Sequence, residues 1–271
     1  MPEKKILFIV TEVSPYLADS EQSLIARHLS QGIYEKGREV RIFMPNFGAV
    51  NERRNQLHEV IRLSGLNIII NDTDHPLVLK VAGMPATRLQ VYFIDNDDYF
   101  ARKRLFHTID GEEFTDNGER AIFFVRGVME TIKKLRWFPD LIHCHGWISA
   151  LTPLYIKKYY KNDPCFKHTK VVYSIYDDEF YTFFSHNFHE ILKIENVKDK
   201  DVVGVKANPD FEALSKLAID FSDGVIQGSP KIYEGLKEYA LSKGVPFLDF
   251  QGEDVYIDKF NELYDKLLLE K

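Results

Sequence analysis

The apolar residues of the first part of the chain fall into short runs separated by a segment with helical spacing. Residues 5–10, KILFIV, form an uninterrupted apolar run, which predicts a strand buried on both faces. Residues 19–37 repeat apolar side chains at helical intervals, with Asp19 as the expected N-cap and Gly37 as the expected end. A second strand-like segment, REVRIFM, follows over residues 38–44 and stops at Pro45. This β-α-β unit predicts a parallel strand pair with a right-handed crossover.

The middle of the chain has a different pattern. Residues 57–95 contain three strand-like runs, which predict a small antiparallel β insertion with a turn at residues 83–85. Helical spacing returns at residue 114, with Thr115 or Asp116 as the expected cap. Strand-like and helix-like segments then alternate, and a last strand and helix are expected to close the edge of the sheet. The pattern predicts one doubly wound, mostly parallel α/β domain over residues 1–271.

Composition and charge exclude several classes of protein. The chain has 271 residues, of which 45% are hydrophobic and 28% are charged, as in ordinary globular proteins. Its net charge of −6 argues against binding to nucleic acid or to an anionic membrane. No apolar run is long enough to span a bilayer, and the N-terminus reads as a strand and not as a signal peptide. Cys144 and Cys165 are too few for a disulfide framework, so we expect free thiols and a cytoplasmic location.

Polar side chains follow the predicted strands where a doubly wound sheet binds its ligand, beyond the carboxyl ends. Glu12 follows the first strand and could accept hydrogen bonds from a ligand hydroxyl, or be an ordinary solvated carboxylate. Asp116 starts a helix, where an aspartate is also a routine cap. The aromatic-rich segment 173–190 includes the run YDDEFY. Its rings could stack on sugars, but we expect most of them to pack in the core.

The run HCHGW, residues 143–147, raises three alternatives. His143 and His145 alternate along a strand, so their rings point to one face of the sheet and Cys144 to the other. They could be two metal ligands, but no strong multi-ligand motif completes such a site. They could instead hydrogen-bond a sugar or phosphate oxygen, or serve only the core. We expect His143 to be a satisfied core residue and His145 to reach the crevice, without a metal or another cofactor.

The chain has no nucleophile elbow, no Walker-type phosphate loop and no G-x-G-x-x-G after the first strand. Residues 15–24, PYLADSEQSL, stand where such a loop would be expected. They form an acid-rich helix start, which repels a diphosphate instead of binding it.

Five segments, in order, resemble the N-terminal half of bacterial glycogen synthases and plant starch synthases. They are KILFIVTEVSPY, KGREVRIFMPNFG, FTDNGERAIFFVRGVME, PDLIHCHGWISALTPLYIK and FSDGVIQGSPKIYEGL. The resemblance covers roughly residues 4 to 240. It implies half of a GT-B fold, in which two Rossmann-like domains enclose the active site. It also implies transfer of glucose from ADP-glucose to the end of an α-1,4-glucan with retention.

The resemblance also assigns residues. Asp116 and His145 would contact the glucosyl unit being transferred. Further substrate contacts would come from the retained residues Glu12, Asn117, Arg120 and Trp147, and from Tyr176 and Asp177, which replace the family's histidine and asparagine. The family's Lys-Thr-Gly-Gly-Leu falls on residues 18–22, ADSEQ, so the donor-binding lysine and both glycines are absent. The family's His-Asp-Trp-His becomes HGWI, and its Thr-x-His-Asn becomes SIYD.

These departures leave three hypotheses. The chain could be a glycogen-synthase-like protein of glucan metabolism that is inactive alone and needs a protein partner to supply the missing half. It could be a non-catalytic relative that binds a sugar, nucleotide sugar or α-glucan. It could be a pure interaction protein with a vestigial cleft. Because charge develops on the leaving diphosphate, loss of its cationic partners makes unaided transfer unfavourable. We expect a complete single-domain protein with no nucleic-acid or membrane partner.

Overall fold

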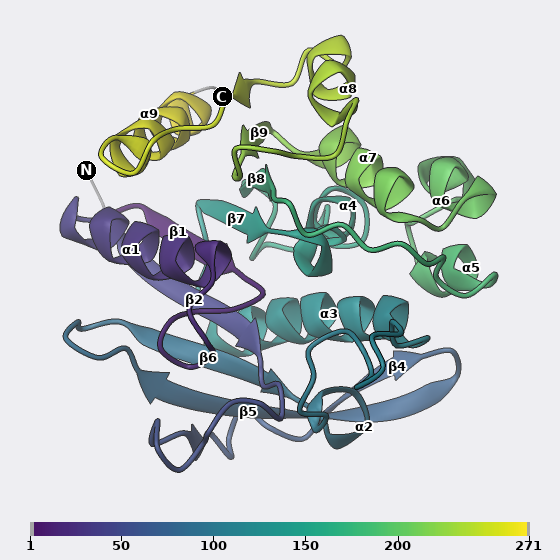
Figure 1. Cartoon of the computed structure of the whole chain (residues 1–271), viewed down its shortest axis with the longest axis horizontal. Coiled ribbons are helices and arrows are strands. Elements are labelled where there is room, and N and C mark those ends of the chain that lie inside the picture. The colour runs from purple at the N-terminus through teal and green to yellow at the C-terminus, as the bar shows by residue number, and fades with distance from the viewer. Residues whose placement is uncertain (1–2, 270–271) are drawn as a thin grey trace.

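The computed structural model describes residues 3–269, and a ten-stranded sheet runs through this part of the chain (Figure 1). Seven strands pair in parallel, in the spatial order β10-β9-β8-β7-β1-β2-β6. Their bounds are β1 Lys5–Ile9, β2 Glu39–Pro45, β6 Gln90–Asp95, β7 Leu141–His145, β8 Lys170–Ile175, β9 Gly224–Gln227 and β10 Phe247–Leu248. The predicted doubly wound, mostly parallel sheet is confirmed.

The antiparallel part is smaller than the sequence predicted. Strand β5 (Thr73–Gly83) runs antiparallel to β6, β3 (His58–Glu59) and β4 (Leu66–Ile70). The assignment of residues 90–95 to a wholly antiparallel insertion is wrong, because β6 pairs in parallel with β2 on its other side. An apolar run buried on both faces cannot show which neighbour it pairs with.

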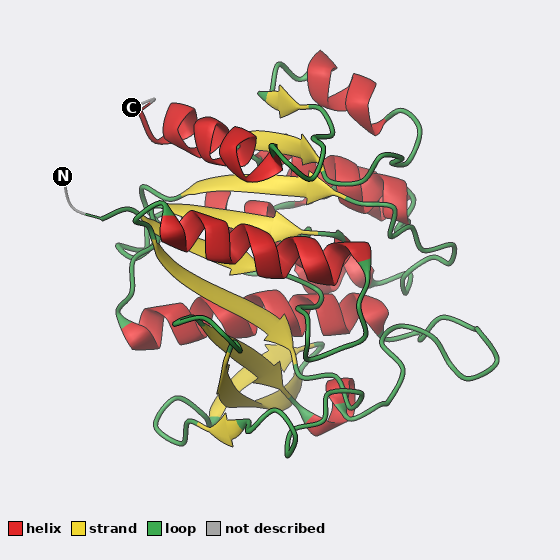
Figure 2. Cartoon of the chain, turned by 60° about the vertical axis from the view of Figure 1, so that its left-hand side comes forward, coloured by secondary structure: helices red, strands yellow, loops and turns green. Residues whose placement is uncertain are grey.

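Helices cover both faces of the sheet (Figure 2). Helices α1 (Glu21–Glu35) and α9 (Tyr256–Leu269) lie side by side on one face, where their apolar side chains pack with Ile6 and Phe8. The other face carries α3 (Asn117–Leu135), α4 (Thr152–Lys157) and α7 (Phe211–Phe221). The shorter helices are α2 Asp97–Phe100, α5 Phe188–Leu192, α6 Val203–Ala207 and α8 Leu236–Ser242, with 3-10 turns at Trp147–Ser149 and Asp199–Asp201.

Two local expectations need correction. Ser20, not Asp19, is the N-cap of α1, because its hydroxyl accepts the Ser23 amide while Asp19 accepts a hydrogen bond from Ser14. The last strand does form the sheet edge, but α9 returns from that edge to the middle of the sheet. There the Tyr264 hydroxyl lies 2.6 Å from Nδ1 of His143 on β7. No helix within residues 3–269 is both long and apolar enough to cross a membrane.

Candidate functional site

A small cavity lies at the carboxyl ends of the central strands, where the strand order reverses. Strand β1 has β2 on one side and β7 on the other, which is the topological switch point of a doubly wound sheet. The loops that follow β1, β7 and β8 meet there around a cavity of about 240 Å³. Its lining residues are Thr11, Glu12, Gln22, Leu105, Phe106, His107, Glu113, Asn117, Trp147, Asp178, Glu179 and Phe180. We call this the switch-point cavity.

The switch-point cavity is acidic. Its lining includes four carboxylates and, within the described chain, neither a lysine nor an arginine. Glu12, predicted from the sequence, does line it, and its carboxylate accepts a hydrogen bond from the Ser20 hydroxyl. Burial raises the pKa of Glu12, although the Ser20 hydrogen bond works in the opposite direction. The cavity therefore offers hydrogen-bond acceptors and repels anions.

Asp178 lies beside Gly146 and Trp147 at the end of β7. Its Oδ2 accepts the Trp147 amide at 2.9 Å, whereas its Oδ1 is buried without a partner in the described chain. Burial raises the pKa of Asp178 to about 6. Gly146 has φ of +73°, and a Cβ there would lie 2.3 Å from Asp178 Oδ2. The Asp178 carboxylate thus occupies the space next to the position where the family carries its own aspartate.

The sequence analysis selected Asp177 and missed Asp178. Asp177 is exposed, does not line the switch-point cavity, and uses its amide to bond the Ser229 hydroxyl at 3.3 Å. The two neighbours differ because Asp178 Oδ2 accepts the Trp147 amide, whereas the Asp177 amide bonds Ser229. These partners follow other strands, so no local signal in the sequence separates the two aspartates.

Glu113 was also missed, and it joins the two loops that form the outer wall. Its carboxylate accepts the amides of Tyr181 at 2.8 Å and Thr182 at 3.0 Å, and the Thr182 hydroxyl as well. Burial acts to raise the pKa of Glu113, but these hydrogen bonds outweigh it and lower the pKa. Glu113 therefore stays ionised and holds loop 101–115 against loop 176–187.

In the Thr-Asp-Asn segment, the aspartate forms an ion pair outside the cavity and the asparagine lines the cavity. Asp116 stands at the predicted N-cap position of α3, but its side chain caps no amide and instead binds Arg102 through two contacts of 2.7 and 2.6 Å. Asn117 does line the cavity, and its amide nitrogen donates to the Phe106 carbonyl at 3.0 Å. Contact between Asp116 and a sugar, which the resemblance predicts, would require Arg102 to move and stays a prediction.

Arg120 lies fully buried behind Asn117. Its Nη1 donates to Asn117 Oδ1 at 2.7 Å and its Nε donates to the Tyr99 carbonyl at 2.8 Å. Burial lowers the pKa of Arg120 to about 10, partly offset by the nearby Asp116 charge. The guanidinium is surrounded by rings at 5.4 to 5.6 Å, from Phe47, Phe100, Phe106 and Phe114. Arg120 therefore orients Asn117 and does not line the cavity.

The two histidines form a buried network with three hydroxyls. His143 Nε2 lies 2.7 Å from Ser174 Oγ, and its Nδ1 lies 2.6 Å from the Tyr264 hydroxyl and 3.2 Å from His145 Nε2. His145 Nδ1 lies 2.8 Å from the Tyr176 hydroxyl. As expected, both rings share one face of the sheet and Cys144 packs in the core on the other.

His143 is therefore the satisfied core residue that the sequence predicted. His145, however, is only 1% exposed and does not line the switch-point cavity, and neither does Tyr176. Burial lowers the pKa of His145 to about 3, so its ring is neutral. The expectation that His145 reaches the crevice is not met in this arrangement, and its contact with a sugar stays a prediction.

Aromatic rings form the floor and side of the cavity. Trp147 packs against Phe106 at 4.6 Å and against Phe180 at 5.2 Å between ring centroids, and all three line the cavity. Trp147 is only 3% exposed, so it presents an edge and not an open stacking surface. Nowhere in residues 3–269 do three or more His, Cys, Asp or Glu side chains form a group able to hold a metal ion.

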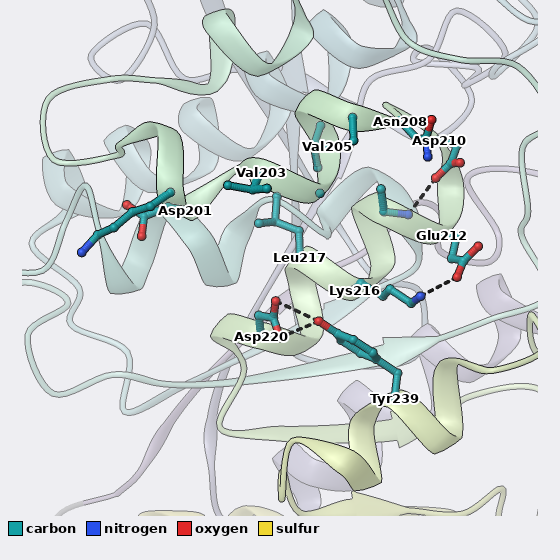
Figure 3. A pocket seen from close by; sticks show the side chains of 14 residues that line it. Asp201, Val203, Val205, Asn208, Asp210, Glu212, Lys216, Leu217, Asp220 and Tyr239 are labelled. Atoms are coloured by element: carbon teal, nitrogen blue, oxygen red, sulfur yellow. Dashed lines mark hydrogen bonds and ion pairs between the residues drawn. The ribbon is translucent and has the colours of Figure 1, made fainter.

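A wider groove between α6, α7 and Tyr239 of α8 lies away from these residues (Figure 3). Its polar side chains satisfy one another, since Lys216 pairs with Glu212 and the Tyr239 hydroxyl donates to Asp220. Asp210 is occupied as the N-cap of α7. The groove therefore offers a ligand few uncommitted polar groups.

Comparison with known proteins agrees with the resemblance. A family model for the starch synthase catalytic domain matches residues 5–246. The chain is 37% identical over 174 residues to a glycogen synthase of Chlorobium limicola and 39% identical over 174 residues to one of Chlorobaculum tepidum. Each match covers 64% of this chain and 36% of the relative, so the chain aligns with about a third of those enzymes. The starch synthase IV catalytic domain from Arabidopsis thaliana, solved with ADP and acarbose, has a TM-score of 0.75 at 18% identity. That match covers 92% of this chain and 52% of the plant domain, and it shows a shared fold.

Proposed function

This chain belongs to the starch synthase catalytic domain family, and we propose that it binds a glucosyl unit of an α-glucan in the switch-point cavity without transferring glucose by itself. The observation that carries the proposal is the lining of the cavity, which combines four carboxylates with aromatic walls and contains no cationic side chain in the described chain. The proposed setting is glucan metabolism in the cytoplasm.

The lining suits a neutral sugar. Sugar hydroxyls donate hydrogen bonds, and the carboxylates of Glu12 and Asp178 line the cavity as acceptors. Asn117 adds an amide whose orientation is fixed by Arg120. We propose Glu12, Asn117, Trp147 and Asp178 as sugar contacts. Arg120 orients Asn117 from outside the cavity. The remaining candidates, Asp116, His145, Tyr176 and Asp177, do not line it.

The same lining argues against transfer from ADP-glucose by this chain alone. The transition state develops negative charge on the leaving diphosphate, and losing one stabilising group typically costs about two to three powers of ten in rate. Arg102 is committed to Asp116, and Arg120 is buried among phenylalanine rings. Four carboxylates would face the diphosphate, and Glu21 lies in the first turn of α1.

A second candidate is a synthase half that a partner protein completes. The curated relatives are much longer than the aligned region, and the loops at the cavity mouth expose large apolar side chains. Ile109 is 81%, Tyr181 83% and Phe183 65% exposed. A partner that covers these side chains and brings lysine or arginine to the cavity would supply the missing positive charge.

Binding and turnover measurements separate the two candidates. Calorimetric titration with maltoheptaose should show binding, and Glu12→Gln should weaken it about threefold to tenfold by removing one charged acceptor. Asp177→Asn, beside the cavity but outside it, is the matched control and should change nothing. Radiolabelled ADP-glucose with glycogen should give no transfer. Steady elongation of glycogen by the purified chain would refute the proposal, and elongation only after a second protein is added would favour the partner-completed synthase.

A further inference from the structure

A second and larger cavity lies on the other side of the α1 N-terminus. It is bounded by α1, by the end of β9 and by the segment that leads into α9, and its volume is about 530 Å³, within the range of roughly 300 to 1,000 Å³ typical of small-molecule sites. Its apolar lining comes from Leu24, Ile25, Phe250, Tyr256, Ile257 and Phe260. We call it the α1/α9 cavity.

One wall of this cavity lies beyond the region that the family model matches. The match to the starch synthase catalytic domain ends at residue 246, whereas the wall is built from residues 250–260. The switch-point cavity shares none of its lining residues with the α1/α9 cavity. The two cavities are therefore separate sites, and the second combines residues of the matched region with a wall that lies beyond it.

The wall is held firmly in place. Lys36 pairs with Asp258, and Arg38 pairs with Asp265, which ties the end of α1 and the residues after it to α9. Gly32 lets the two helices approach closely, since a Cβ there would lie 2.7 Å from Ile257 Cγ2. Tyr264 adds the buried bond to His143. The cavity is thus formed before any ligand arrives, which lowers the entropic cost of binding.

Tyr256 indicates that the cavity is built for a ligand. Its side chain is only 8% exposed and lines the cavity, yet its hydroxyl has no hydrogen-bond partner in the described chain. Burial of the ring raises the pKa of Tyr256 to about 12, so the hydroxyl is a neutral donor and acceptor. The hydroxyl faces the open cavity, so water or a ligand hydroxyl there can bond to it.

The remaining polar groups define the class of ligand. Three carboxylates line the cavity, together with two amides and one imidazole, and the described chain contributes no lysine or arginine to the lining. These polar residues are Glu21, Glu253, Asp254, Gln227, Gln251 and His28. Anions are therefore disfavoured. Aromatic rings beside carboxylate and amide acceptors suit the apolar face and the hydroxyl edge of a sugar ring.

We propose that the α1/α9 cavity is a second carbohydrate site, which takes one or two rings of a neutral oligosaccharide against Phe250 with a hydroxyl bonded to Tyr256. The site itself is argued from its own residues, and only the choice of a glucan fragment as the probe rests on the proposed function. Two sites on one chain would let the protein hold a glucan at two points, which increases its affinity for long chains over short ones.

The test is a titration of the full chain with maltotriose, followed by the side-chain amide signal of Gln251 in two-dimensional NMR. Tyr256→Phe should weaken binding at this site about threefold to tenfold, because one hydrogen bond is lost while no protein contact changes. Phe250→Ala should weaken it at least as much. Phe138→Ala, which removes a ring that is 52% exposed elsewhere on the surface, is the matched control and should have no effect.

The outcomes separate this proposal from the proposed function. The second site is supported if maltotriose moves the Gln251 signal with the same affinity in the parent and in Glu12→Gln, and with about threefold to tenfold lower affinity in Tyr256→Phe. No shift of Gln251 at saturating maltotriose overturns it, even if calorimetry still shows binding that Glu12→Gln weakens. A Gln251 shift in which Phe250→Ala and Tyr256→Phe both bind maltotriose as tightly as the parent also overturns it, provided urea unfolding shows both variants to be folded.

Discussion

Replacing Gly146 by alanine tests the most specific contact in the switch-point cavity. Gly146 has φ of +73° and ψ of 177°, a conformation that is essentially restricted to glycine. A Cβ at this position would lie 2.3 Å from Asp178 Oδ2, the atom that accepts the Trp147 amide at 2.9 Å. Alanine therefore adds backbone strain and also displaces the carboxylate from its hydrogen bond.

The cost can be worked from these two effects. Backbone strain at such a conformation contributes about 1 to 3 kcal/mol. Displacing Asp178 leaves the Trp147 amide without its partner, which costs about another 1 to 3 kcal/mol. We expect Gly146→Ala to lower the free energy of unfolding by about 2 to 6 kcal/mol, a large fraction of the stability of a typical domain.

A double-mutant cycle of Gly146→Ala and Asp178→Ala, measured by urea unfolding, isolates the steric clash between the added Cβ and the Asp178 carboxylate. In Asp178→Ala the carboxylate is already gone, so adding Gly146→Ala to it should cost only the backbone strain. The two substitutions together should therefore destabilise less than the sum of the singles, by about 1 to 3 kcal/mol. Gly37→Ala is the control, because Gly37 has φ of +82° but no atom within 4 Å of its Cβ position. A cycle that is additive to within about 0.5 kcal/mol would show that the contact is not as described.

Three further predictions concern charge and burial. Because the pKa of Asp178 is raised to about 6, the folded state holds its proton more tightly than the unfolded state, so this residue lowers stability as the pH rises from 4 to 6. Asp178→Asn should remove that decline and raise the free energy of unfolding at pH 7 by up to about 3 kcal/mol. Asp177→Asn is the control and should have neither effect. Urea unfolding at pH 4 and pH 7 measures both variants. The opposite sign holds for His145, whose pKa is lowered to about 3: its neutral ring favours the folded state above pH 6.5, and that stability is lost as the pH falls. NMR titration should find the His145 ring signals unchanged from pH 7 to pH 5, and a midpoint near 6.5 would contradict its burial. Arg120→Ala should cost about 3 kcal/mol or more in thermal unfolding, because it removes two buried hydrogen bonds and a ring-enclosed side chain, while Arg104→Ala on the exposed loop should cost less than about 0.5 kcal/mol.

The parallel core of the fold could be predicted from the sequence. Segments such as residues 5–10 are apolar on both faces of the expected strand, and they alternate along the chain with segments of helical periodicity. This pattern leaves few arrangements other than a parallel sheet covered by helices on both faces. The alternation of His143, Cys144 and His145 across β7 followed from the strand period alone. The family could be recognised from the sequence because its motifs are short local segments that occur in the same order along this chain.

The composition of the site was decided by tertiary structure. Sequence placed Asp116 at a helix start, but only folding brings Arg102 to its carboxylate, and it does so in place of a cap. His145 stands at a strand end, yet Tyr176 and the network to α9 enclose it. Strand β6 pairs in parallel on one side and antiparallel on the other, which no local pattern shows.

The two cavities show why sequence alone could not define the binding sites. Residues 21–28 and 250–260 meet only because α9 returns from the edge of the sheet to pack beside α1. Asp178 faces inward, and its neighbour Asp177 faces solvent, because contacts with Trp147 and Ser229 fix the backbone between them. Local sequence fixes the backbone period and the apolar faces. Burial, hydrogen-bond partners and pKa depend on atoms that come from distant parts of the chain, so they are determined only when the chain has folded.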